Sequence, residues 1–479
     1  MNLKSIQISN YRSIKNVDIL IEKLEDNSYT YGLIGENEAG KTSILKGIGF
    51  KDKQNNITVI SKDHRDKNKY IDLRLTYMLS VKEVKSVIEY VKSIDKDNVF
   101  DETNYKDLIL EYSKNIDSSE IEIFIVYKNK DGDEQFDVIQ QSGEFYEFIL
   151  LKIHKTIFWS YDERFLISQE IFLSDFFADP LNTSVPLTNC FQLAGYKIES
   201  FLNLQKEIAA DSTDREDIRE KLGEAVTKHI KRVWKNHDIR ISFDLTPDKI
   251  NFHIKDNKSK GKAKTADQRS DGFKQFISFL LTVSAQHVNS QLNNTILLLD
   301  EPETHLHPVA QEFFLEELTE ISKTNNNIVF FATHSNYFID KKHLNRNYKV
   351  WKEDDQTHIK KFDEKNSTYA SVNYDVFNIT STDYHNELYG LAFDLSGITD
   401  LKKFDANIKE IIKKTPIKKN YKHTNQNRFD CSLPTYVRHQ IHHPENKLND
   451  DYTEKEFKES ISILQEYIEY KSKNNTKEE

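Results

Sequence analysis

The sequence predicts an α/β chain with a layered domain built on a parallel sheet, an inserted lobe, and a bundle of helices at its end. Two runs, "TILLLD" and "NIVFFATHS", are almost wholly apolar, which is typical of parallel strands buried on both faces. A shorter apolar run, "TYGLIG", precedes a helical pattern near the start of the chain. From about residue 382 onward, apolar side chains recur at helical spacing.

Length and composition describe a well-solvated chain of more than one domain. Its 479 residues exceed the usual size of a single core, and 30% of them are charged. No apolar run is long enough to span a membrane, and the first residues lack the apolar core of a signal peptide, so we expect a cytoplasmic protein. The two cysteines, Cys190 and Cys431, exclude a disulfide framework and a four-cysteine zinc site.

Basic residues are concentrated in two segments, although the net charge is −10. Between Lys402 and Arg428 there are eight lysines and one arginine against Asp405 and Glu410. The second segment, "KDNKSKGKAK", contains Lys255, Lys258, Lys260, Lys262 and Lys264. Each segment is either a solvated basic face or a surface that follows a phosphate backbone.

The segment "YGLIGENEAGKTSILKGI" matches the phosphate-binding loop pattern between Gly35 and Thr42. Glycines let successive backbone N–H groups turn toward the phosphates, Lys41 reaches the terminal phosphates, and the Thr42 hydroxyl coordinates Mg²⁺. A strand leads into the loop and a helix follows, whose N-terminus favours bound anions. We assign the nucleotide contacts of this loop to Gly35, Asn37, Gly40, Lys41, Thr42 and Ser43.

An acidic pair closes the downstream run "TILLLDEPETHLHP". Asp300 is expected to hold Mg²⁺ through its water shell, and Glu301 to act as general base on the attacking water. The next strand, "NIVFFATHS", leads to His334. We expect this histidine to face the ligand crevice at the carboxyl edge of the sheet, with a core histidine as the alternative.

These residues resemble the ATP-binding-cassette (ABC-type) ATPases, whose heads are P-loop nucleotide-binding domains. Lys41, the Asp300–Glu301 pair and His334 match the phosphate loop, acidic strand and switch histidine of that family. The segment "DEPETHLHP" resembles the branch that contains RecF, OLD-type nucleases and ATPases of bacterial anti-phage defence. The resemblance covers roughly residues 1–50 and 265–340, and it implies ATP and Mg²⁺ as cofactors.

The same branch has a short signature ahead of the acidic strand, and "RSDGFKQFISFLL" is similar to it. Ser270 and Gly272 begin this helix, where a hydroxyl and backbone N–H groups favour a bound phosphate. In the family these groups reach the nucleotide across a dimer, so the resemblance implies that ATP binding and dimerisation are one event. The segment "ISNYRSIKNVDI" resembles the opening hairpin of the family, which makes Arg12 a further candidate nucleotide contact.

The ABC-type head is expected to occupy residues 1–350, with an inserted lobe at about 85–265 that is assigned by position alone. A β extension or linker at 351–380 and a helical domain at 381–479 are expected to follow. The helical pattern at 196–235 is too short for an SMC-type coiled coil. The segment "WKEDDQTHIKK" is typical of a hairpin at a sheet edge, and no acidic nuclease module is recognisable after the head, which weakens an OLD-nuclease assignment.

Helices are predicted throughout the C-terminal domain. The first places Tyr384, Leu388, Leu391 and Leu395 on one side and ends at Gly397. A later helix starts at the N-cap Ser432 with Pro434 in its first turn, and Pro444 ends it at His442 or His443. The last helix has the capping box Thr453–Glu456, the hydrophobic staple Tyr452–Phe457, and the apolar stripe Phe457, Ile461, Leu464 and Ile468.

Arg438 and His443 are separated by four residues in "VRHQIHHPEN". The spacing, the polar His439 after the arginine and the position just before the last helix resemble the R-x4-H motif of HEPN ribonucleases. The resemblance implies a HEPN-like domain that cleaves RNA without metal at a site shared by two protomers. There the histidine assists attack of the ribose 2′-hydroxyl, and the arginine stabilises charge on the phosphate.

Other interpretations of this segment stay open. Three histidines are candidate zinc ligands, but His442 and His443 are adjacent and diverge, and the nearest cysteine, Cys431, is distant. The segment is otherwise a helix end fixed by hydrogen bonds from Arg438, His442 and His443 to nearby loops and Glu445. A HEPN fold can also serve only as a dimerisation module.

Together these features predict an ATP-hydrolysing, dimeric ABC-type ATPase that controls a toxic effector in anti-phage defence, with RNA (tRNA in the nearest analogy) cleaved by its own HEPN-like domain. One alternative is an ATPase sensor or scaffold that holds a separately encoded nuclease or toxin. Another is a RecF-like ATPase of DNA repair or DNA-end binding. The expected partners are a second copy or a higher even number of copies, a protein effector, and RNA or DNA, but no membrane.

Overall fold

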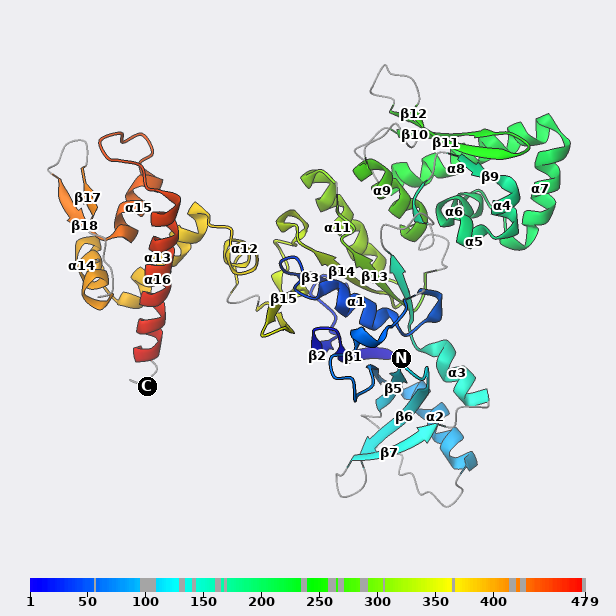
Figure 1. Cartoon of the computed structure of the whole chain (residues 1–479), viewed down its shortest axis with the longest axis horizontal. Helices are drawn as coiled ribbons and strands as arrows, with labels where there is room; N and C mark the ends of the chain where they lie inside the picture. Colours follow the sequence, from blue (N-terminus) through cyan, green and yellow to red (C-terminus); the bar gives the residue numbers. More distant parts are fainter. Residues whose placement is uncertain are drawn as a thin grey trace. The chain divides into compact units, whose positions relative to one another are not determined.

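The computed structural model divides the chain into two compact units, Met1–Asp363 and Glu364–Glu479 (Figure 1). The structure describes residues 1–55, 57–94, 109–128, 134–139, 144–159, 165–167, 170–233, 239–256, 264–265, 271–284, 292–304, 306–363, 367–412, 419–422 and 428–475. Among these residues, no helix combines the length and the apolar character that a membrane span requires.

A mixed six-stranded sheet forms the centre of the first unit, in the order β16-β15-β3-β14-β13-β8. Its strands are β3 (Thr30–Ile34), β8 (Lys155–Trp159), β13 (Thr295–Asp300), β14 (Ile328–Thr333), β15 (Asn347–Glu353) and β16 (Gln356–Lys361). All neighbouring strands are parallel except the β15–β16 hairpin. The three apolar runs in the sequence are β3, β13 and β14, so these strands are confirmed, and so is the edge hairpin.

The central strands are buried on both faces because each side of the sheet packs against a separate core. In β13, Ile296 and Leu298 enter one core, whereas Leu297 and Leu299 enter the other. Helix α1 (Lys41–Gly49) packs in the first core, and α11 (Pro308–Ser322) packs in the second. Burial of both faces explains why these strands lack an alternation of polar and apolar residues.

A second, wholly antiparallel sheet packs against α1 in the order β2-β1-β4-β5-β6-β7. Its strands are β1 (Asn2–Tyr11), β2 (Ile14–Leu20), β4 (Asp72–Met78), β5 (Ile109–Asn115), β6 (Ile121–Lys128) and β7 (Glu134–Ile139). The predicted opening hairpin is confirmed, with Ile8 paired to Val17. Helix α2 (Val81–Ile94) follows β4 in the chain, and α3 (Glu144–Lys152) follows β7.

The expected inserted range 85–265 therefore does not form a single lobe. Strands β5–β7 extend the N-terminal sheet through pairing with β4, and β8 joins the central sheet beside β13. Alternate residues of β5, such as Leu110 and Tyr112, enter the same core as α1, which holds the strand in that sheet. Position in the sequence did not reveal this pairing, because the contacts join distant segments.

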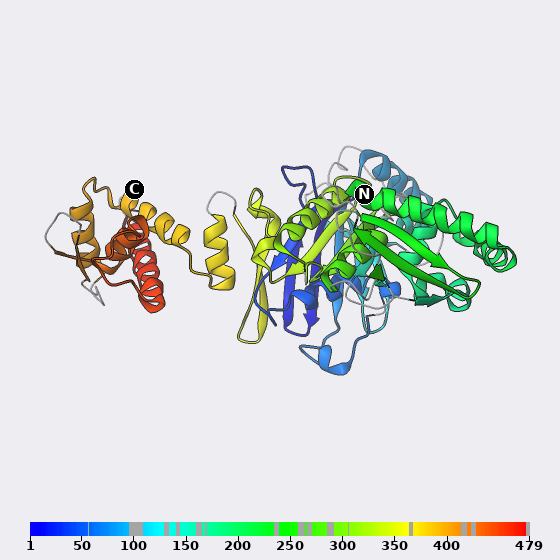
Figure 2. The same cartoon turned by 90° about the horizontal axis from the view of Figure 1, so that it is seen from above.

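The remaining lobe combines helices with a small antiparallel sheet of β9 (Glu170–Phe172), β10 (Ile239–Leu245), β11 (Lys249–Asp256) and β12 (Lys264–Thr265). Its helices are α4 (Leu173–Ala178), α5 (Pro180–Thr183), α6 (Val185–Leu193), α7 (Phe201–Ala210) and α8 (Ser212–Val233). Helix α8 packs along β10 (Figure 2). The helical pattern predicted at 196–235 is thus two helices, because Asp211 has extended backbone angles. Helix α9 (Asp271–Phe279) continues into a π-helical turn, Leu280–Ser284.

The second unit is mainly helical. It contains α12 (Tyr369–Phe377), α13 (Thr382–Ser396), α14 (Leu401–Ile411), α15 (Leu433–His442) and α16 (Glu454–Asn475). The short strands β17 (Lys419–Tyr421) and β18 (Phe429–Cys431) form a hairpin that the sequence did not predict. The first unit extends beyond residue 350, because β15 and β16 belong to its central sheet, and the expected linker at 351–380 contains helix α12.

The predicted ends of the last two helices are confirmed. The Ser432 side chain caps α15, which ends at His442, and Thr453 and Glu456 form a reciprocal capping box at the start of α16. Tyr452 stacks on Phe457, with ring centroids 5.2 Å apart. The predicted stripe of α16 faces the core of this unit.

The predicted apolar face of α13 is wrong in part. Leu391 is 47% exposed, whereas Leu388 is 9% exposed. The buried face instead contains His385, Tyr389 and Ala392 together with Tyr384 and Leu388. The prediction counted only apolar residues, and therefore omitted a histidine and a tyrosine that find hydrogen-bond partners inside the core.

This difference predicts unequal effects of two substitutions on one helix. Leu388→Ala should lower the free energy of unfolding by about 2–4 kcal/mol, because it removes buried methyl groups and leaves a cavity. Leu391→Ala is the matched control and should change it by no more than about 0.5 kcal/mol. Urea unfolding of the full chain measures both, and equal effects would contradict the described face.

Candidate functional site

The phosphate loop connects β3 to α1 under tight steric constraints. A Cβ atom at Gly35 would lie 2.1 Å from the Val350 carbonyl oxygen of β15. Gly40 is the N-cap of α1 with φ 106°, and a Cβ there would lie 2.2 Å from Thr357 Oγ1. Both positions therefore require glycine, which explains the spacing that the sequence pattern detected.

Lys41 is held inside the loop. Its side chain is almost fully buried, and Nζ donates hydrogen bonds of 2.8 Å to the carbonyl oxygens of Gly35 and Glu36. Burial lowers the pKa of Lys41, while Glu301 and Asp300 act in the opposite direction. The loop therefore keeps a cation at its centre, where it can contact the terminal phosphates of a nucleotide.

Thr42 and Asp300 join the first helix to the end of the acidic strand. The Thr42 hydroxyl donates a 2.9 Å hydrogen bond to Asp300 Oδ1. Burial raises the pKa of Asp300, and the hydrogen bond from Thr42 opposes that shift. A hydroxyl and a carboxylate at one point are hard oxygen ligands, so these two residues fit Mg²⁺ that is shared with nucleotide phosphates.

The described residues contain no group of three or more His, Cys, Asp or Glu side chains arranged to hold a metal ion. An ion bound by Thr42 and Asp300 would therefore take its remaining ligands from phosphate oxygens and water, which is the usual way Mg²⁺ binds in nucleotide sites.

Glu301 and His334 follow two neighbouring strands and lie together. His334 Nδ1 is 3.3 Å from Glu301 Oε1, and both side chains are partly exposed. Glu301 has φ 48°, and its backbone N–H donates to the Ala332 carbonyl of β14. The sheet thus holds the Glu301 backbone in a left-handed conformation directly after β13.

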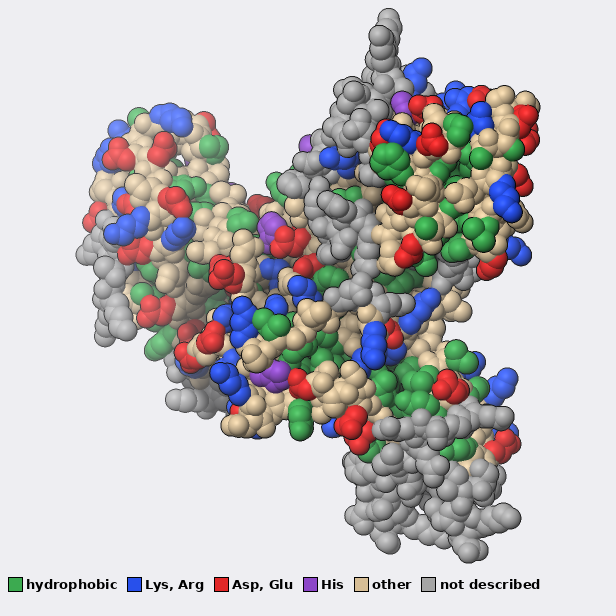
Figure 3. Space-filling model, turned by 45° about the vertical axis from the view of Figure 1, so that its right-hand side comes forward, with side chains coloured by type: hydrophobic (Ala, Val, Ile, Leu, Met, Phe, Trp, Pro, Cys, Tyr) green, Lys and Arg blue, Asp and Glu red, His purple; other side chains and the backbone are tan. Residues whose placement is uncertain are grey.

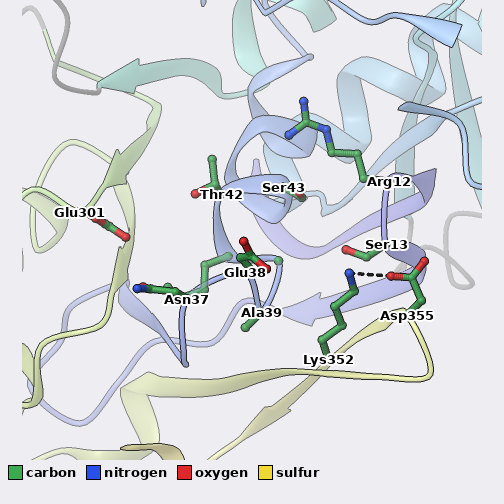
Figure 4. Close-up of a pocket in the computed structure, with 12 residues that line it drawn as sticks. Arg12, Ser13, Asn37, Glu38, Ala39, Thr42, Ser43, Glu301, Lys352 and Asp355 are labelled. Carbon is green, nitrogen blue, oxygen red and sulfur yellow. Dashed lines mark ion pairs between the residues drawn. The ribbon is translucent and has the colours of Figure 1, made fainter. Parts of the chain in front are cut away.

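The phosphate loop and Glu301 line a pocket of about 320 Å³. Glu301 lies on one side of the phosphate loop, and Arg12, Ser13 and the Lys352–Asp355 ion pair lie on the other (Figure 4). The lining also includes Asn37, Gly40, Lys41, Thr42 and Ser43. Arg12 stands at φ 53° in the β1–β2 turn, and its Nε donates a 2.9 Å hydrogen bond to Asp63.

The structure therefore brings the predicted nucleotide contacts of the loop together with Arg12, Asp300, Glu301 and His334. Ser270 lies outside the described residues, and Gly272 is in the first turn of α9. Gln275 of α9 donates a 3.2 Å hydrogen bond to the Pro302 carbonyl, so this helix is tied to the loop after the acidic strand.

Glu303 is a residue of this site that the sequence analysis did not select. It is 2% exposed; Thr333 donates a hydrogen bond to its Oε1, and its Oε2 has no hydrogen-bond partner among the described residues. Burial raises its pKa to about 7. In the sequence, the one indication of Glu303 was that a second carboxylate follows Glu301 by two residues. An exposed glutamate in a surface turn would fit that spacing equally well.

Arg438 and His443 contact different partners in the second unit. The Arg438 guanidinium lies over the Tyr389 ring, 4.9 Å from its centroid. His443 is the C-cap of α15, and its Nδ1 lies 3.3 Å from Glu445 Oε1. The adjacent His439 stacks on Tyr421, with centroids 4.7 Å apart. The C-cap position and the Glu445 contact agree with the structural interpretation of this helix end, whereas Arg438 keeps its N–H edges unpaired among the described residues.

Part of the basic segment between Lys402 and Arg428 is neutralised. Lys409 forms an ion pair with Asp405, and Lys419 forms one with Glu456. Residues 413–418 and 423–427 lie outside the described residues, as do three lysines of the other segment, Lys258, Lys260 and Lys262.

The buried carboxyl group of Glu303 predicts a pH-dependent stability. Between about pH 4.5 and pH 7 the unfolded chain ionises this group while the folded chain keeps its proton, so ionisation of Glu303 lowers stability as pH rises. Glu303→Gln should therefore gain stability relative to the parent between about pH 5 and pH 7.5 in urea unfolding. The control Glu320→Gln, at a 66% exposed side chain, should show no such gain; a pH-independent difference for Glu303→Gln would contradict the prediction.

Parts of the chain are similar to two known proteins. One relative is the uncharacterized protein MJECL43 of Methanocaldococcus jannaschii, 32% identical over 125 residues, which are 25% of this chain and 32% of that protein. Another is the Old nuclease of Escherichia phage P2, 25% identical over 141 residues, 25% of this chain and 24% of that protein. The matches thus span about a third and about a quarter of these two relatives.

Among solved structures, the SMC head domain from Thermotoga maritima aligns with a TM-score of 0.37 at 10% identity, over 76% of this chain and 100% of that one. The SMC head bound to the C-winged helix domain of ScpA aligns with a TM-score of 0.42 at 13% identity, over 76% and 99%. A family model described as "AAA ATPase domain" matches residues 1–339, which include the phosphate loop, the acidic strand and His334. Because that match spans well over half of the chain, the chain belongs to the AAA ATPase domain family.

Proposed function

We propose that the chain hydrolyses ATP with Mg²⁺ at the phosphate loop. The observation that carries the proposal is the Thr42–Asp300 hydrogen bond, which brings a hydroxyl and a carboxylate together beside Lys41 and Glu301. Loop N–H groups and Lys41 bind the phosphates, and Thr42 with Asp300 would hold the ion, which supplies positive charge against the phosphate oxygens.

Glu301 is the general base of this reaction. Its carboxylate accepts a proton from water as the water oxygen bonds to the γ-phosphorus, and the bond from that phosphorus to the bridging oxygen breaks to release ADP. His334, 3.3 Å from Glu301, orients the carboxylate. Arg12 and Ser13 bind the nucleotide farther along the pocket.

Two substitutions test this proposal. Lys41→Ala removes the cation from the loop and Glu301→Gln removes the base, so each should lower Mg²⁺-dependent release of phosphate from ATP by at least about 100-fold. Glu312→Gln on the outer part of α11 is the matched control and should keep the parent rate. Normal turnover in Lys41→Ala or Glu301→Gln would overturn the assignment.

The heads act as dimers in this proposal, closed by ATP that also contacts Ser270 and Gly272 of the partner copy. Within one copy, Gln275 ties the described part of α9 to the loop that follows Glu301. A change at the acidic loop would therefore move the helix start that contacts the second nucleotide.

The effector in this proposal is the C-terminal unit, which cleaves RNA under control of the ATPase as part of anti-phage defence. Its support is the sequence resemblance together with one geometric feature of Arg438. The Tyr389 ring holds the face of the guanidinium, and Arg438 donates no hydrogen bond among the described residues, so its N–H edges stay available for a phosphate. His443 would accept the 2′-hydroxyl proton as that oxygen bonds to phosphorus, and the 5′-oxygen of the next nucleotide leaves.

Cleavage of total tRNA by the purified chain with ATP tests the effector assignment. Arg438→Ala and His443→Ala should each reduce cleavage by about 100-fold or more, because they remove charge stabilisation and the base. His442→Ala is the neighbouring control and should retain cleavage. Cleavage that persists in both Arg438→Ala and His443→Ala would overturn the assignment of these two residues as a HEPN-like cleavage site.

A second candidate function is an ATPase scaffold that holds a separately encoded nuclease or toxin. It is favoured by the separate partners of Arg438 and His443, which are a tyrosine ring and Glu445. Co-purification of a second protein, with no cleavage by the chain alone, distinguishes this function. A RecF-like role on DNA has less support, since acidic and basic side chains are interspersed on the described face in Figure 3 and the net charge is −10.

A further inference from the structure

The β15–β16 hairpin forms a wall of the nucleotide pocket. Strand β15 pairs in parallel with β3, the strand that leads into the phosphate loop. Asp354 and Asp355, both with positive φ, form the two-residue turn that joins the hairpin strands. Lys352 and Asp355 pair near this turn and line the pocket beside Arg12 and Ser13 (Figure 4).

Thr357, the second residue of β16, contacts the phosphate loop directly. It is 1% exposed, and its Oγ1 donates a 3.1 Å hydrogen bond to the Ala39 carbonyl. Ser13 Oγ lies 2.7 Å from the same Oγ1 and must donate to it, because the single hydroxyl proton of Thr357 is already used. The Thr357 backbone N–H also donates to the Ser13 carbonyl, at 2.8 Å.

The Thr357 side chain also fills the space that a side chain at Gly40 would need. An added Cβ at Gly40 would lie 2.2 Å from Thr357 Oγ1 and 2.9 Å from its Cγ2. The residue that precedes Lys41 is thus packed against the hydroxyl and the methyl group of one threonine. A shift of the β15–β16 hairpin would therefore displace the phosphate loop at Gly40, and a shift of the phosphate loop would displace the hairpin.

The β1–β2 turn is fixed to the same hairpin by a second set of contacts. Arg65 Nη1 donates to the carbonyl oxygens of Asp355, at 2.6 Å, and Ser13, at 3.2 Å. Ser13 therefore receives hydrogen bonds from Thr357 and Arg65 while it lines the nucleotide pocket. Three chain segments that are far apart in the sequence meet at Thr357.

We propose that Thr357 is a positioning residue that fixes the phosphate loop and the β1–β2 turn at Ser13 in their nucleotide-binding geometry. Through Thr357, the β15–β16 hairpin responds to bound nucleotide. The inference rests on ATP turnover at this loop, as proposed above. Strand β16 ends at Lys361, and the first unit ends at Asp363, so the hairpin is the last element before the C-terminal unit. The hairpin therefore contacts the phosphate loop and also leads directly into the C-terminal unit along the chain.

Two variants of Thr357 separate its hydroxyl from its shape. Thr357→Val keeps the volume and removes both hydroxyl hydrogen bonds, and Thr357→Ser keeps the hydroxyl. Thr295→Val is the matched control, since Thr295 is also fully buried and donates to one carbonyl, that of Asn293, at the end of β13 opposite Asp300. All are made in the full chain, with KM and kcat for ATP measured with Mg²⁺ beside the melting temperature.

Thr357→Val should raise KM by about five- to tenfold through loss of the loop hydrogen bonds, with a smaller change in kcat and near-parent values in Thr357→Ser. Thr295→Val should lower the melting temperature without a change in KM. An unchanged KM in Thr357→Val, or an equal rise in Thr295→Val, would overturn the positioning role. Lys41→Ala, measured in parallel, separates this failure from that of the proposed function, because turnover that survives in Lys41→Ala contradicts the ATPase assignment itself.

Amide hydrogen exchange tests the response of the hairpin. ATPγS with Mg²⁺ should slow exchange in residues 356–361 of the parent chain and of Thr357→Ser. The slowing should be lost in Thr357→Val at a nucleotide concentration that saturates the variant. Equal slowing in the parent and in Thr357→Val would show that the hairpin does not respond through this residue.

Discussion

The hydrogen bond between Thr42 and Asp300 is the contact on which the nucleotide site depends. It joins residues that are 258 positions apart, one at the start of α1 and one at the end of β13. Strand β14 lies between β3 and β13 in the sheet, so the parallel register sets the distance between the two side chains. Any change that slides these strands would separate a hydroxyl from a carboxylate and move Glu301 relative to Lys41.

Close packing around the loop makes that register costly to change. The backbone at Gly35 lies against β15, and the backbone at Gly40 lies against Thr357, with no space for a side chain at either position. Closely packed protein interiors have low compressibility, so a displacement at one residue is transmitted to its neighbours. The buried charges destabilise the fold, because burial favours the neutral form of each group. It lowers the pKa of Lys41 and raises the pKa values of Asp300 and Glu303. A bound nucleotide with its cation would offset part of that cost.

The sequence predicted those parts of the site whose chemistry requires a particular residue at a particular spacing. Gly40, Lys41 and Thr42 follow from the geometry of the loop, and Asp300 and Glu301 follow from the end of a fully apolar strand. Thr357 and Glu303 were not predictable in this way, because a threonine in an edge hairpin and a carboxylate in a polar turn have no special spacing. Their importance comes from partners such as Ala39 and Thr333, which lie 318 and 30 residues away. The fold had the same limit, since position alone placed residues 85–265 in one inserted lobe, whereas β5 pairs with β4 and β8 pairs with β13.

In the C-terminal unit the packing around Arg438 is more informative than the motif spacing. Its neighbour His385 is fully buried, and burial, followed by the charges of Arg438 and His442, lowers the His385 pKa to about 4. His385 is therefore neutral at physiological pH, and it adds no positive charge beside the arginine. The Tyr389 ring, held by a hydrogen bond between its hydroxyl and Thr435, supports the face of the guanidinium. Arg438 donates no hydrogen bond among the described residues. The fully buried Arg346 differs, because its guanidinium donates to Asp26, Asp340, Ser28 and the Thr30 carbonyl.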